Sequence, residues 1–316
     1  MKRSMAALYT KLAIAIALLF GIIFGLLTLI AYIAGYAQPL VIAFIALFVV
    51  VLQYLISPKI VEFSMKVRYV SEQEMPKLHE IVERLAEKAS IPKPKVGISE
   101  IDLPNAFAFG RSRKDGRVCV TRGLLEILND EEIEAVIGHE ISHIKHRDMI
   151  VITLLSVVPL MSYYIFWSTL YGRDRNKASL ISGMAFGIYL VSNLIVLWVS
   201  RLREYYADYG SYNLTGKSHP LASALYRITA NTSRIPPIKL KSVEGVKAFF
   251  ATDPSTARND ISDLRSADLN LDGHLDEYEI KYFSQRTKAT PFEKVMEIFS
   301  SHPNVVDRIK RLAELS

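Results

Sequence analysis

The chain of 316 residues is long enough for one large domain or two small ones, and half of its residues are apolar. Its 38 basic and 32 acidic residues give a net charge of +6, but the basic residues are dispersed and partly flank apolar runs, which argues against a nucleic-acid surface. The single cysteine, Cys119, excludes an intrachain disulfide and a cysteine-rich metal site. We therefore expect a membrane protein that does not bind nucleic acid.

Four uncharged apolar runs predict four transmembrane helices, arranged as two hairpins. The first hairpin comprises residues 12–34 and 40–57, and the second comprises residues 149–170 and 179–199. A run of about 20 apolar residues spans a hydrocarbon core of roughly 30 Å. For the second hairpin, the alternative is a buried helical pair in a soluble core.

Basic residues on the flanks of the first hairpin predict the orientation of the chain. They precede its first run and follow its second, at Lys2, Arg3, Lys11, Lys59, Lys66 and Arg68. Because cytoplasmic flanks carry the excess of Lys and Arg, the polar segments 58–148 and 200–316 are expected in the cytoplasm. The sequence thus predicts a multi-pass protein of the plasma (inner) membrane, in which hairpin 1–57 precedes one cytoplasmic domain and hairpin 149–199 separates the two parts of that domain.

The first polar segment predicts a mainly α fold with a small β-sheet (α+β). Residues 71–74 fit a capping box, followed by a helix with apolar spacing through Leu78, Ile81, Val82 and Leu85. Short strand-like runs follow at residues 95–99, 105–110 and 117–121. A further helix is expected to begin near Asn129 or Asp130, and the chain is expected to end in a helix from about Asn304.

The helix from residue 130 carries the pattern His139-Glu140-Ile141-Ser142-His143. Histidines four apart project from one face of a helix and can share a tetrahedral metal, for which zinc is the expected ion. The carboxylate of Glu140 stands beside them, where it can take a proton from a metal-activated water. The pattern alone also fits a surface helix with paired histidines.

A catalytic zinc needs a third protein ligand. His146 lies on the same helical face, but roughly 10 Å along the axis from His139, too far for convergence on one ion. Glu204 at the end of the fourth apolar run is the better candidate, and Asp208, one turn later, could accept the N–H of a ligand histidine. The alternative is a membrane boundary where Glu204 pairs with the nearby arginines.

A family resemblance adds to these patterns. It is carried by the segments Gly138 to Asp148, Arg203 to Asp208, and Ser301-His302-Pro303 with Arg308-Ile309. With them, nearly the whole chain resembles the HtpX family of membrane metalloproteases, which are related to the CAAX prenyl proteases. The resemblance implies a zincin-like (gluzincin) zinc endopeptidase that cleaves misfolded or damaged membrane proteins in proteolytic quality control, with Glu204 as third zinc ligand.

The resemblance also implies further site residues. Asn105, Ala106, Phe107 and Ala108 would form an edge strand that pairs with the substrate backbone, and His302 and Arg308 would approach the active site. From the residues alone, strand addition is possible, but a core strand is the commoner explanation of Ala106 and Phe107. His302 and Arg308 could stabilise an oxyanion, or could belong to an ordinary helix start.

A second metal signature lies at residues 268–279, DLNLDGHLDEYE, which fits an EF-hand calcium loop and departs from the HtpX pattern. The expected ligands are Asp268, Asn270, Asp272, the His274 carbonyl, Asp276 and Glu279. A turn rich in Asp, Asn and Gly is the alternative. We hypothesise that a bound divalent ion orders this segment and supports the C-terminal helix that carries Arg308.

The sequence therefore predicts a membrane zinc endopeptidase whose partners are the lipid bilayer and damaged membrane proteins as substrates. Two alternatives remain, a membrane-anchored calcium-binding or scaffold protein that does not cleave, and a dedicated prenyl-peptide processing protease. Glu140 and Glu204 favour an active enzyme, because a scaffold has no chemical need for either carboxylate.

Overall fold

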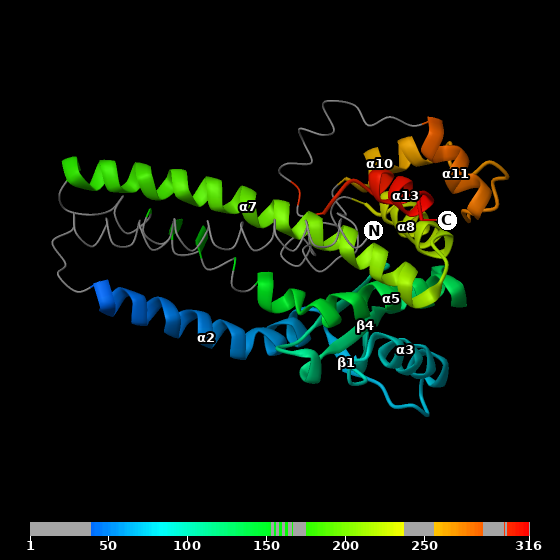
Figure 1. Ribbon diagram of the computed structural model, residues 1–316, viewed down its shortest axis with the longest axis horizontal. Coiled ribbons are helices and arrows are strands. Elements are labelled where there is room, and N and C mark those ends of the chain that lie inside the picture. The colour runs from blue at the N-terminus through cyan, green and yellow to red at the C-terminus, as the bar shows by residue number, and fades with distance from the viewer. Residues whose placement is uncertain are drawn as a thin grey trace. The chain divides into compact units, whose positions relative to one another are not determined.

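The structure is a computed structural model, and it describes residues 39–152, 155, 158–159, 162–163, 166, 175–236, 256–286, 300 and 302–315. Within these ranges the fold is mainly helical, with one small mixed sheet (Figure 1). The expected class is thereby confirmed. The expected membrane run 12–34 lies outside the described residues, as does most of the run 149–170.

The four strands of the sheet lie in the order β1-β2-β4-β3. Their bounds are Val67–Tyr69, Lys95–Ser99, Ala106–Phe109 and Arg117–Thr121 for β1 to β4. β2 and β4 pair in parallel, whereas β1 and β3 join them antiparallel at the two edges. The sequence predicted β2, β3 and β4 within one residue at each end, but not β1, whose three residues are too few to show an alternating pattern.

Helix α3 (Pro76–Ala89) packs beside the sheet. It buries the predicted apolar stripe, including Leu78, Val82 and Leu85, and ends at Ser90 in the left-handed conformation. The predicted start at residues 71–74 is wrong: Ser71 and Glu74 do exchange the hydrogen bonds of a capping box, but these close a turn, and the helix begins at Pro76. Pro76 is suited to the first turn because it lacks the N–H that would be unpaired there.

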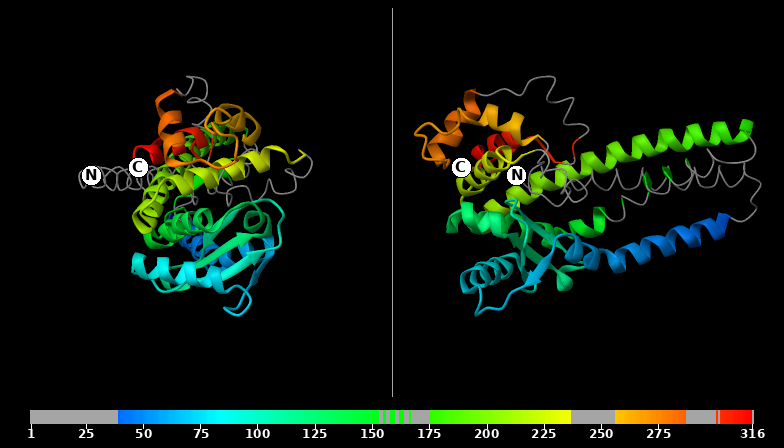
Figure 2. Two further views of the ribbon diagram at one scale, coloured as in Figure 1. Left: turned by 90° about the vertical axis from the view of Figure 1, so that its right-hand side faces the viewer. Right: turned by 180° about the vertical axis from the view of Figure 1, so that it is seen from behind.

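Helix α5 (Asp130–His146) lies between the sheet on one side and helix α8 (His219–Ser233) on the other (Figures 1 and 2). Between β4 and α5 the chain forms the short helix α4 (Arg122–Ile127), and a single 3-10 turn (Arg113–Asp115) precedes β4. One apolar core joins all these elements, because buried residues of α3, the sheet, α5 and α8 belong to the same cluster.

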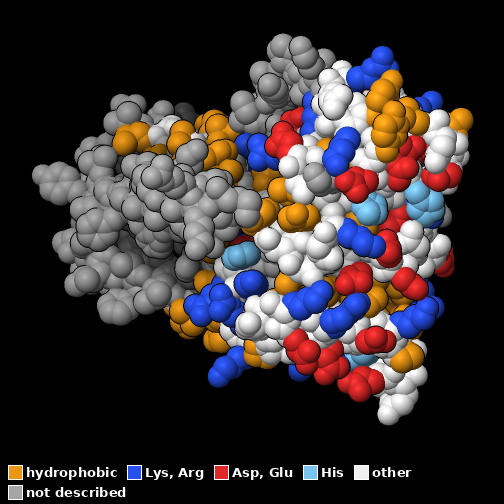
Figure 3. All heavy atoms as spheres, turned by 45° about the vertical axis from the view of Figure 1, so that its right-hand side comes forward, with side chains coloured by type: hydrophobic (Ala, Val, Ile, Leu, Met, Phe, Trp, Pro, Cys, Tyr) orange, Lys and Arg blue, Asp and Glu red, His pale blue; other side chains and the backbone are white. Residues whose placement is uncertain are grey.

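The C-terminal helices extend this core. They are α10 (Ala257–Leu264), α11 (Glu277–Arg286) and α13 (Val305–Ala313), and they gather beside α8. α13 is capped by Asn304, whose side chain accepts from the amide of Val306, close to the predicted start. On the face drawn in Figure 3, Lys and Arg side chains are interspersed with Asp and Glu.

Two long helices include the predicted apolar runs 40–57 and 179–199, namely α2 (Pro39–Ser64) and α7 (Arg175–Thr215). Among the described helices, the segment Ser182–Thr215 of α7 is the one that is long and apolar enough to cross a membrane. The chain divides into two compact units, residues 1–56 with 150–199, and residues 57–149 with 200–316. Every contact described below lies within the second unit.

Candidate metal centre

Helix α5 fixes the two histidines of the metal motif. Its N-terminus carries a complete capping box, in which Asn129 accepts from the amide of Glu132 and Glu132 accepts from the amide of Asn129. The helix ends at Arg147 in the left-handed conformation. His139 and His143 therefore lie well inside a regular helix, one turn apart and both buried.

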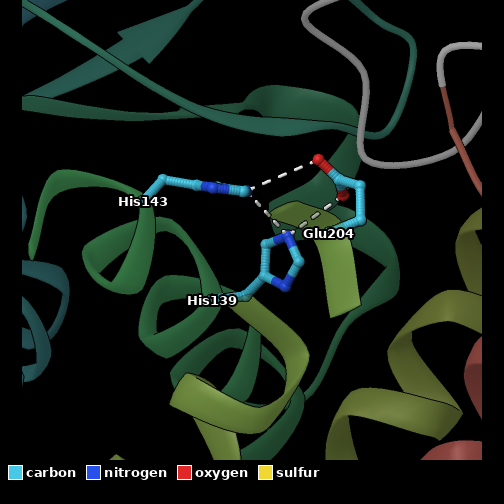
Figure 4. A group of neighbouring side chains, drawn as sticks. All are labelled: His139, His143 and Glu204. Atoms are coloured by element: carbon cyan, nitrogen blue, oxygen red, sulfur yellow. Dashed lines mark hydrogen bonds and ion pairs between the residues drawn. The ribbon is translucent and has the colours of Figure 1, made fainter. Parts of the chain in front are cut away.

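Glu204 of helix α7 meets these histidines in space (Figure 4). The two Nε2 atoms lie 3.1 Å apart, and the Glu204 carboxylate oxygens lie 3.4 Å from Nε2 of His139 and 3.6 Å from Nε2 of His143. A tetrahedral zinc with ligand bonds of about 2.0–2.1 Å separates its ligand atoms by about 3.3 Å. The two histidine nitrogens and the Glu204 carboxylate, which faces one nitrogen with each oxygen, thus form a triangle of groups of the size that one zinc ion requires.

A carboxylate behind each histidine fixes which ring nitrogen faces the triangle. Nδ1 of His143 lies 2.6 Å from Asp148, and Nδ1 of His139 lies 2.9 Å from Asp208. The second contact is a close ion-pair approach whose angle departs from that of an aligned hydrogen bond. With the Nδ1 side of each ring beside a carboxylate, the two Nε2 atoms face each other and Glu204, an arrangement that a cation relieves.

The charges around the site also favour a cation. Burial lowers the pKa of His139, but the carboxylates of Asp208 and Glu204 outweigh burial and raise it to about 9. Burial likewise opposes ionisation of Asp148, yet Arg203 and His143 hold its pKa below the ordinary value. Ionised carboxylates around two buried imidazoles thus create a negative pocket that fits a divalent transition metal.

Arg308 of helix α13 offsets part of this negative charge. It is almost fully buried, and its guanidinium donates to both oxygens of Asp208, from Nε at 2.9 Å and from a terminal nitrogen at 2.6 Å. A third nitrogen lies 3.6 Å from Glu204. Such a fork holds a carboxylate in one plane. Arg308 therefore lies behind the ligand carboxylates, bound to the partner of His139.

Glu140 lies at the junction of α5 and the sheet. Its side chain is buried, and the carboxylate accepts the backbone N–H of Ala108 in β3. Burial raises the pKa of the Glu140 carboxyl, although the neighbouring histidines act in the opposite direction. The residue next to the metal ligands is thus tied directly to the edge strand.

In strand β3, the backbone N–H and C=O groups of alternate residues point toward β4 or away from it. Asn105 exchanges hydrogen bonds with Thr121 at the end of β4, so residues 105, 107 and 109 point their backbone groups toward β4. By the period of two, Ala106 and Ala108 point theirs away from β4. The predicted segment Asn105 to Ala108 is therefore an edge strand beside Glu140, while its side chains, Phe107 included, are largely buried.

Small residues bring α5 and α7 close enough for Glu204 to reach the histidines. A Cβ added at Gly210 would lie 2.0 Å from Oγ and 2.6 Å from Cβ of Ser142. One turn nearer the start of α5, Gly138 faces Ser211, whose hydroxyl donates to the carbonyl of Ala135 at 2.6 Å. The two helices are thus in near backbone contact along the turns that carry the metal ligands.

The other predicted residues also have defined positions. His302 is buried just ahead of α13, and the adjoining Ser300 carbonyl accepts from Arg201, one turn before Glu204 on α7. His146 contacts Ser142 and stands outside the metal group. Arg203, an alternative partner for Glu204 in the sequence, lies 3.3 Å from Asp148 instead.

Sequence reasoning missed Asp148, Arg203 and Gly210 as parts of the site. Asp148 follows the helix C-cap, and a local signal existed, since it is five residues after His143 and the intervening Arg147 turns the chain back. Arg203 and Gly210 act across two helices distant in sequence, and no local pattern marks them.

The EF-hand-like loop forms no comparable group of ligands. Among the described residues, His139, His143 and Glu204 are the one set of His, Cys, Asp or Glu side chains whose ligand atoms gather within 4.8 Å. The loop carboxylates instead accept backbone amides of the loop itself. The calcium expectation stays a prediction.

Comparison with known proteins gives one family. The model of peptidase family M48 matches residues 72–316. A protease HtpX homologue of Methanothermobacter thermautotrophicus is 56% identical over 225 residues, 71% of this chain and 87% of the relative. One from Pyrococcus furiosus is 37% identical over 312 residues, 95% of this chain and 94% of the relative.

A solved structure has a similar fold. The crystal structure of S. mikatae Ste24p aligns over 97% of this chain and 67% of its own length, with a TM-score of 0.50 and 17% sequence identity. At this identity the likeness concerns the fold alone.

Proposed function

Because the chain belongs to peptidase family M48 and is a zinc metalloprotease of the HtpX type, we propose that it cleaves misfolded or damaged membrane proteins at the cytoplasmic face of the plasma membrane. The observation that carries the proposal is the triangle of His139, His143 and Glu204, whose third member belongs to the same helix as the apolar segment Ser182–Thr215. One helix thus contains both a candidate membrane span and a metal ligand.

Exposed apolar side chains on the long helices support a membrane location. At least two fifths of the side-chain surface is exposed at Phe48, Leu52, Leu55 and Phe63 of α2, and at Phe186, Leu190 and Val191 of α7. Exposed apolar side chains of this kind are stable in contact with lipid tails, which are themselves apolar. The full count of four spans and the cytoplasmic orientation belong to the proposal, and they rest on the hydropathy and basic flanks of the chain.

The residues of the site suit peptide hydrolysis. Zinc bound by His139, His143 and Glu204 supplies Lewis acidity to the scissile carbonyl and to the attacking water. Glu140 is proposed to take the proton of that water and to deliver it to the leaving nitrogen, so that it ends the cycle ionised as it began. Its hydrogen bond from Ala108 supports this role, because it aims the carboxylate at one point beside the ligands.

We assign substrate binding to the edge of β3 that faces away from β4. An extended peptide that pairs with Ala106 would add a strand to the sheet and pass beside Glu140, which already accepts the N–H of Ala108. Main-chain pairing of this kind is sequence-tolerant, which suits a protease that degrades damaged proteins of many sequences. His302 keeps its predicted role in oxyanion stabilisation, whereas the fork from Arg308 to Asp208 supports a positioning role for that residue.

The test uses purified full-length protein in lipid vesicles, with metal analysis and two substrates, an unfolded membrane protein and its folded form. The wild type should contain one zinc per chain and cleave the unfolded form faster. Glu140→Ala should retain zinc but lose nearly all cleavage, since only the proton carrier is removed. Glu204→Ala should lose the zinc itself.

Three outcomes would contradict the proposal. Equal cleavage by wild type and Glu140→Ala would exclude the assigned chemistry. A zinc-loaded wild type that binds substrates without cleaving them would favour a scaffold. Cleavage restricted to a prenylated peptide, with no activity on the unfolded membrane protein, would identify a dedicated processing enzyme.

A further inference from the structure

The segment from Asp268 to Glu279 has the backbone of a cation-binding loop between two helices, α10 and α11. Two of its residues are in the left-handed conformation, Leu271 with φ of 62° and Gly273 with φ of 82°. Together they turn the chain twice within four residues. The last side chain of the loop, Glu279, is buried and accepts the amides of Leu269 and Asn270 near the loop's beginning.

The first side chain of the loop carries a buried oxygen that points to a ligand. Asp268 is only 6% exposed. Its Oδ2 accepts from the amide of Gly273 at 3.0 Å and from the hydroxyl of Tyr226 at 3.3 Å, so the carboxylate faces the loop interior. Within the described part of the chain, its Oδ1 has no hydrogen-bond partner. A buried carboxylate oxygen without a donor is unfavourable unless a cation binds it.

The peptide bond between His274 and Leu275 has its N–H and its carbonyl on opposite sides. The amide of Leu275 donates to the hydroxyl of Ser223 in α8 at 3.0 Å. In a trans peptide the carbonyl points opposite to the N–H. The His274 carbonyl is therefore directed away from the Ser223 hydroxyl. His274 is the seventh residue of the loop, the position that supplies a backbone carbonyl ligand in a calcium loop.

The same region of the loop contacts the N-terminus of the helix that carries the zinc ligands. The hydroxyl of Ser223 donates to Oε1 of Glu132 at 2.6 Å, and Nδ1 of His274 lies 3.0 Å from that oxygen. Glu132 is the buried glutamate of the capping box that begins α5. In Figures 1 and 2, α11 and the loop before it lie beside α8.

We propose that residues 268–279 bind a calcium ion, and that its occupancy stabilises the first turns of the zinc-site helix through His274, Ser223 and Glu132. An ion that draws on the His274 carbonyl fixes the adjoining peptide, which in turn fixes Ser223 and the capping glutamate. The hydrogen bonds that leave the loop reach α8 and α5. Helix α11, which the loop leads into, packs against α13, so support of the helix that carries Arg308 stays a prediction beside this one.

Binding is tested on zinc-loaded full-length protein with Tb³⁺ as the probe, displaced by Ca²⁺. Excitation of Tyr226, whose hydroxyl contacts Asp268, should sensitise the Tb³⁺ emission. Glu279→Gln should weaken Ca²⁺ binding by at least about tenfold, because it removes a carboxylate from the last ligand position. The control is Glu277→Gln, a carboxylate in the same loop at a position that supplies no ligand, and it should bind as the wild type does.

Coupling is tested by amide hydrogen exchange at the start of α5, a measurement that needs no proteolysis. Added Ca²⁺ should slow exchange several-fold in residues 130–136 of the wild type and of Glu277→Gln, but not of Glu279→Gln. Ser223→Ala should still bind Ca²⁺ while the slowing is reduced, because it removes the hydroxyl that joins Leu275 to Glu132 and leaves the ligand positions of the loop intact.

Each result bears on one part of the proposal. Equal Tb³⁺ and Ca²⁺ binding by Glu279→Gln and Glu277→Gln would overturn the site, and displacement of Tb³⁺ by Mg²⁺ as readily as by Ca²⁺ would overturn the choice of ion. Calcium binding without any change of exchange in α5 would overturn the coupling. None of these outcomes depends on whether membrane proteins are the substrates.

Discussion

Asp148 and Asp208 decide how the two histidine rings of the metal site are used. Each lies within 3 Å of an Nδ1 atom, at 2.6 Å and 2.9 Å, and so leaves the Nε2 atoms for the metal. A partner of this kind holds the ring orientation and increases the basicity of the ligand nitrogen. Residues that never touch the ion thus contribute to its affinity.

The first prediction concerns Asp148→Asn, which keeps the size of the side chain but removes its charge. Zinc affinity should fall by about 10–100-fold, since the His143 ligand loses its carboxylate partner. The measurement is competition for zinc with a chelator of known affinity. Glu134→Gln is the matched control, because it neutralises a carboxylate of the same helix that pairs with Arg84 outside the site. Equal affinities for the two variants would contradict the assignment.

Arg308 gives a second prediction. Arg308→Lys retains the positive charge but replaces the guanidinium, which donates two hydrogen bonds to Asp208, with a single ammonium group. The buried carboxylate of Asp208 therefore loses a hydrogen bond. The free energy of unfolding should fall by about 1–3 kcal/mol in a denaturant titration. Arg311→Lys, on the same helix but stacked over Tyr205, should change it by less than about 1 kcal/mol. A stable Arg308→Lys variant that keeps full zinc affinity would count against the positioning role.

Helix packing determines whether the three ligands meet at all. Glu204 is separated from His143 by 60 residues of chain, so its position depends on the contact between α5 and α7. That contact is close because Gly210 has no side chain where Ser142 approaches. Interiors tolerate little added volume at such points.

The third prediction is that Gly210→Ala separates the two helices and weakens zinc binding. The new methyl group would lie 2.6 Å from Cβ of Ser142, an atom that cannot rotate away, and overpacking of this kind costs about 1–3 kcal/mol. Gly187→Ala in the same helix has open space around it and should leave the zinc content unchanged. Zinc content and the melting temperature of both variants would be measured. Unchanged values for Gly210→Ala would show that α5 and α7 adjust freely.

The edge strand gives the fourth prediction. Ala106→Pro removes an N–H that points away from β4, so the sheet should stay paired while a substrate strand loses one hydrogen bond. We expect KM for an unfolded substrate to rise about 5–10-fold, as loss of about 1 kcal/mol of binding implies, with kcat little changed. Steady-state kinetics measure this, with Ala106→Val as the control for added volume, because Ala106 is buried in the apolar core. A kcat loss without a KM change would argue against backbone pairing at this position.

At the scale of the whole molecule, the metal site joins elements from distant parts of the chain. Helix α5, the C-terminal half of α7 and helix α13 converge there through His139, Glu204, Asp208 and Arg308. The acidic groups are buried, and the site therefore contains negative charge that a bound cation compensates. Metal occupancy should matter for stability as well as for catalysis.

The fifth prediction follows: removal of zinc with a zinc-selective chelator should lower the melting temperature of the protein. Zinc at about a thousand times its Kd stabilises the folded state by about 4 kcal/mol. Added zinc should restore the transition. A His139→Ala and His143→Ala double variant is the control, because it should melt at one temperature with or without chelator. A wild type that melts unchanged after zinc loss would place the site outside the cooperative core.

The family and much of the local structure could be predicted from the sequence. The HtpX resemblance is confirmed by the family model and by relatives that align along nearly the whole chain. The helix of the metal motif was expected from its capping residue and from histidines four apart, since both signals act within a few residues. The predicted start of α3 was wrong because hydrogen bonds of the capping-box type also close an isolated turn.

Only the tertiary structure decided which elements far apart in the chain contact one another. The sequence by itself determined that His139 and His143 share a face, because helical periodicity is local. It could not determine that Arg308 would form a two-pronged hydrogen bond with Asp208, or that Asp148 would contact both His143 and Arg203. Nor could it determine that Ser223 would join the loop at residues 268–279 to Glu132. Those pairings depend on how closely helices approach, and that is set by the shape of the whole packed core.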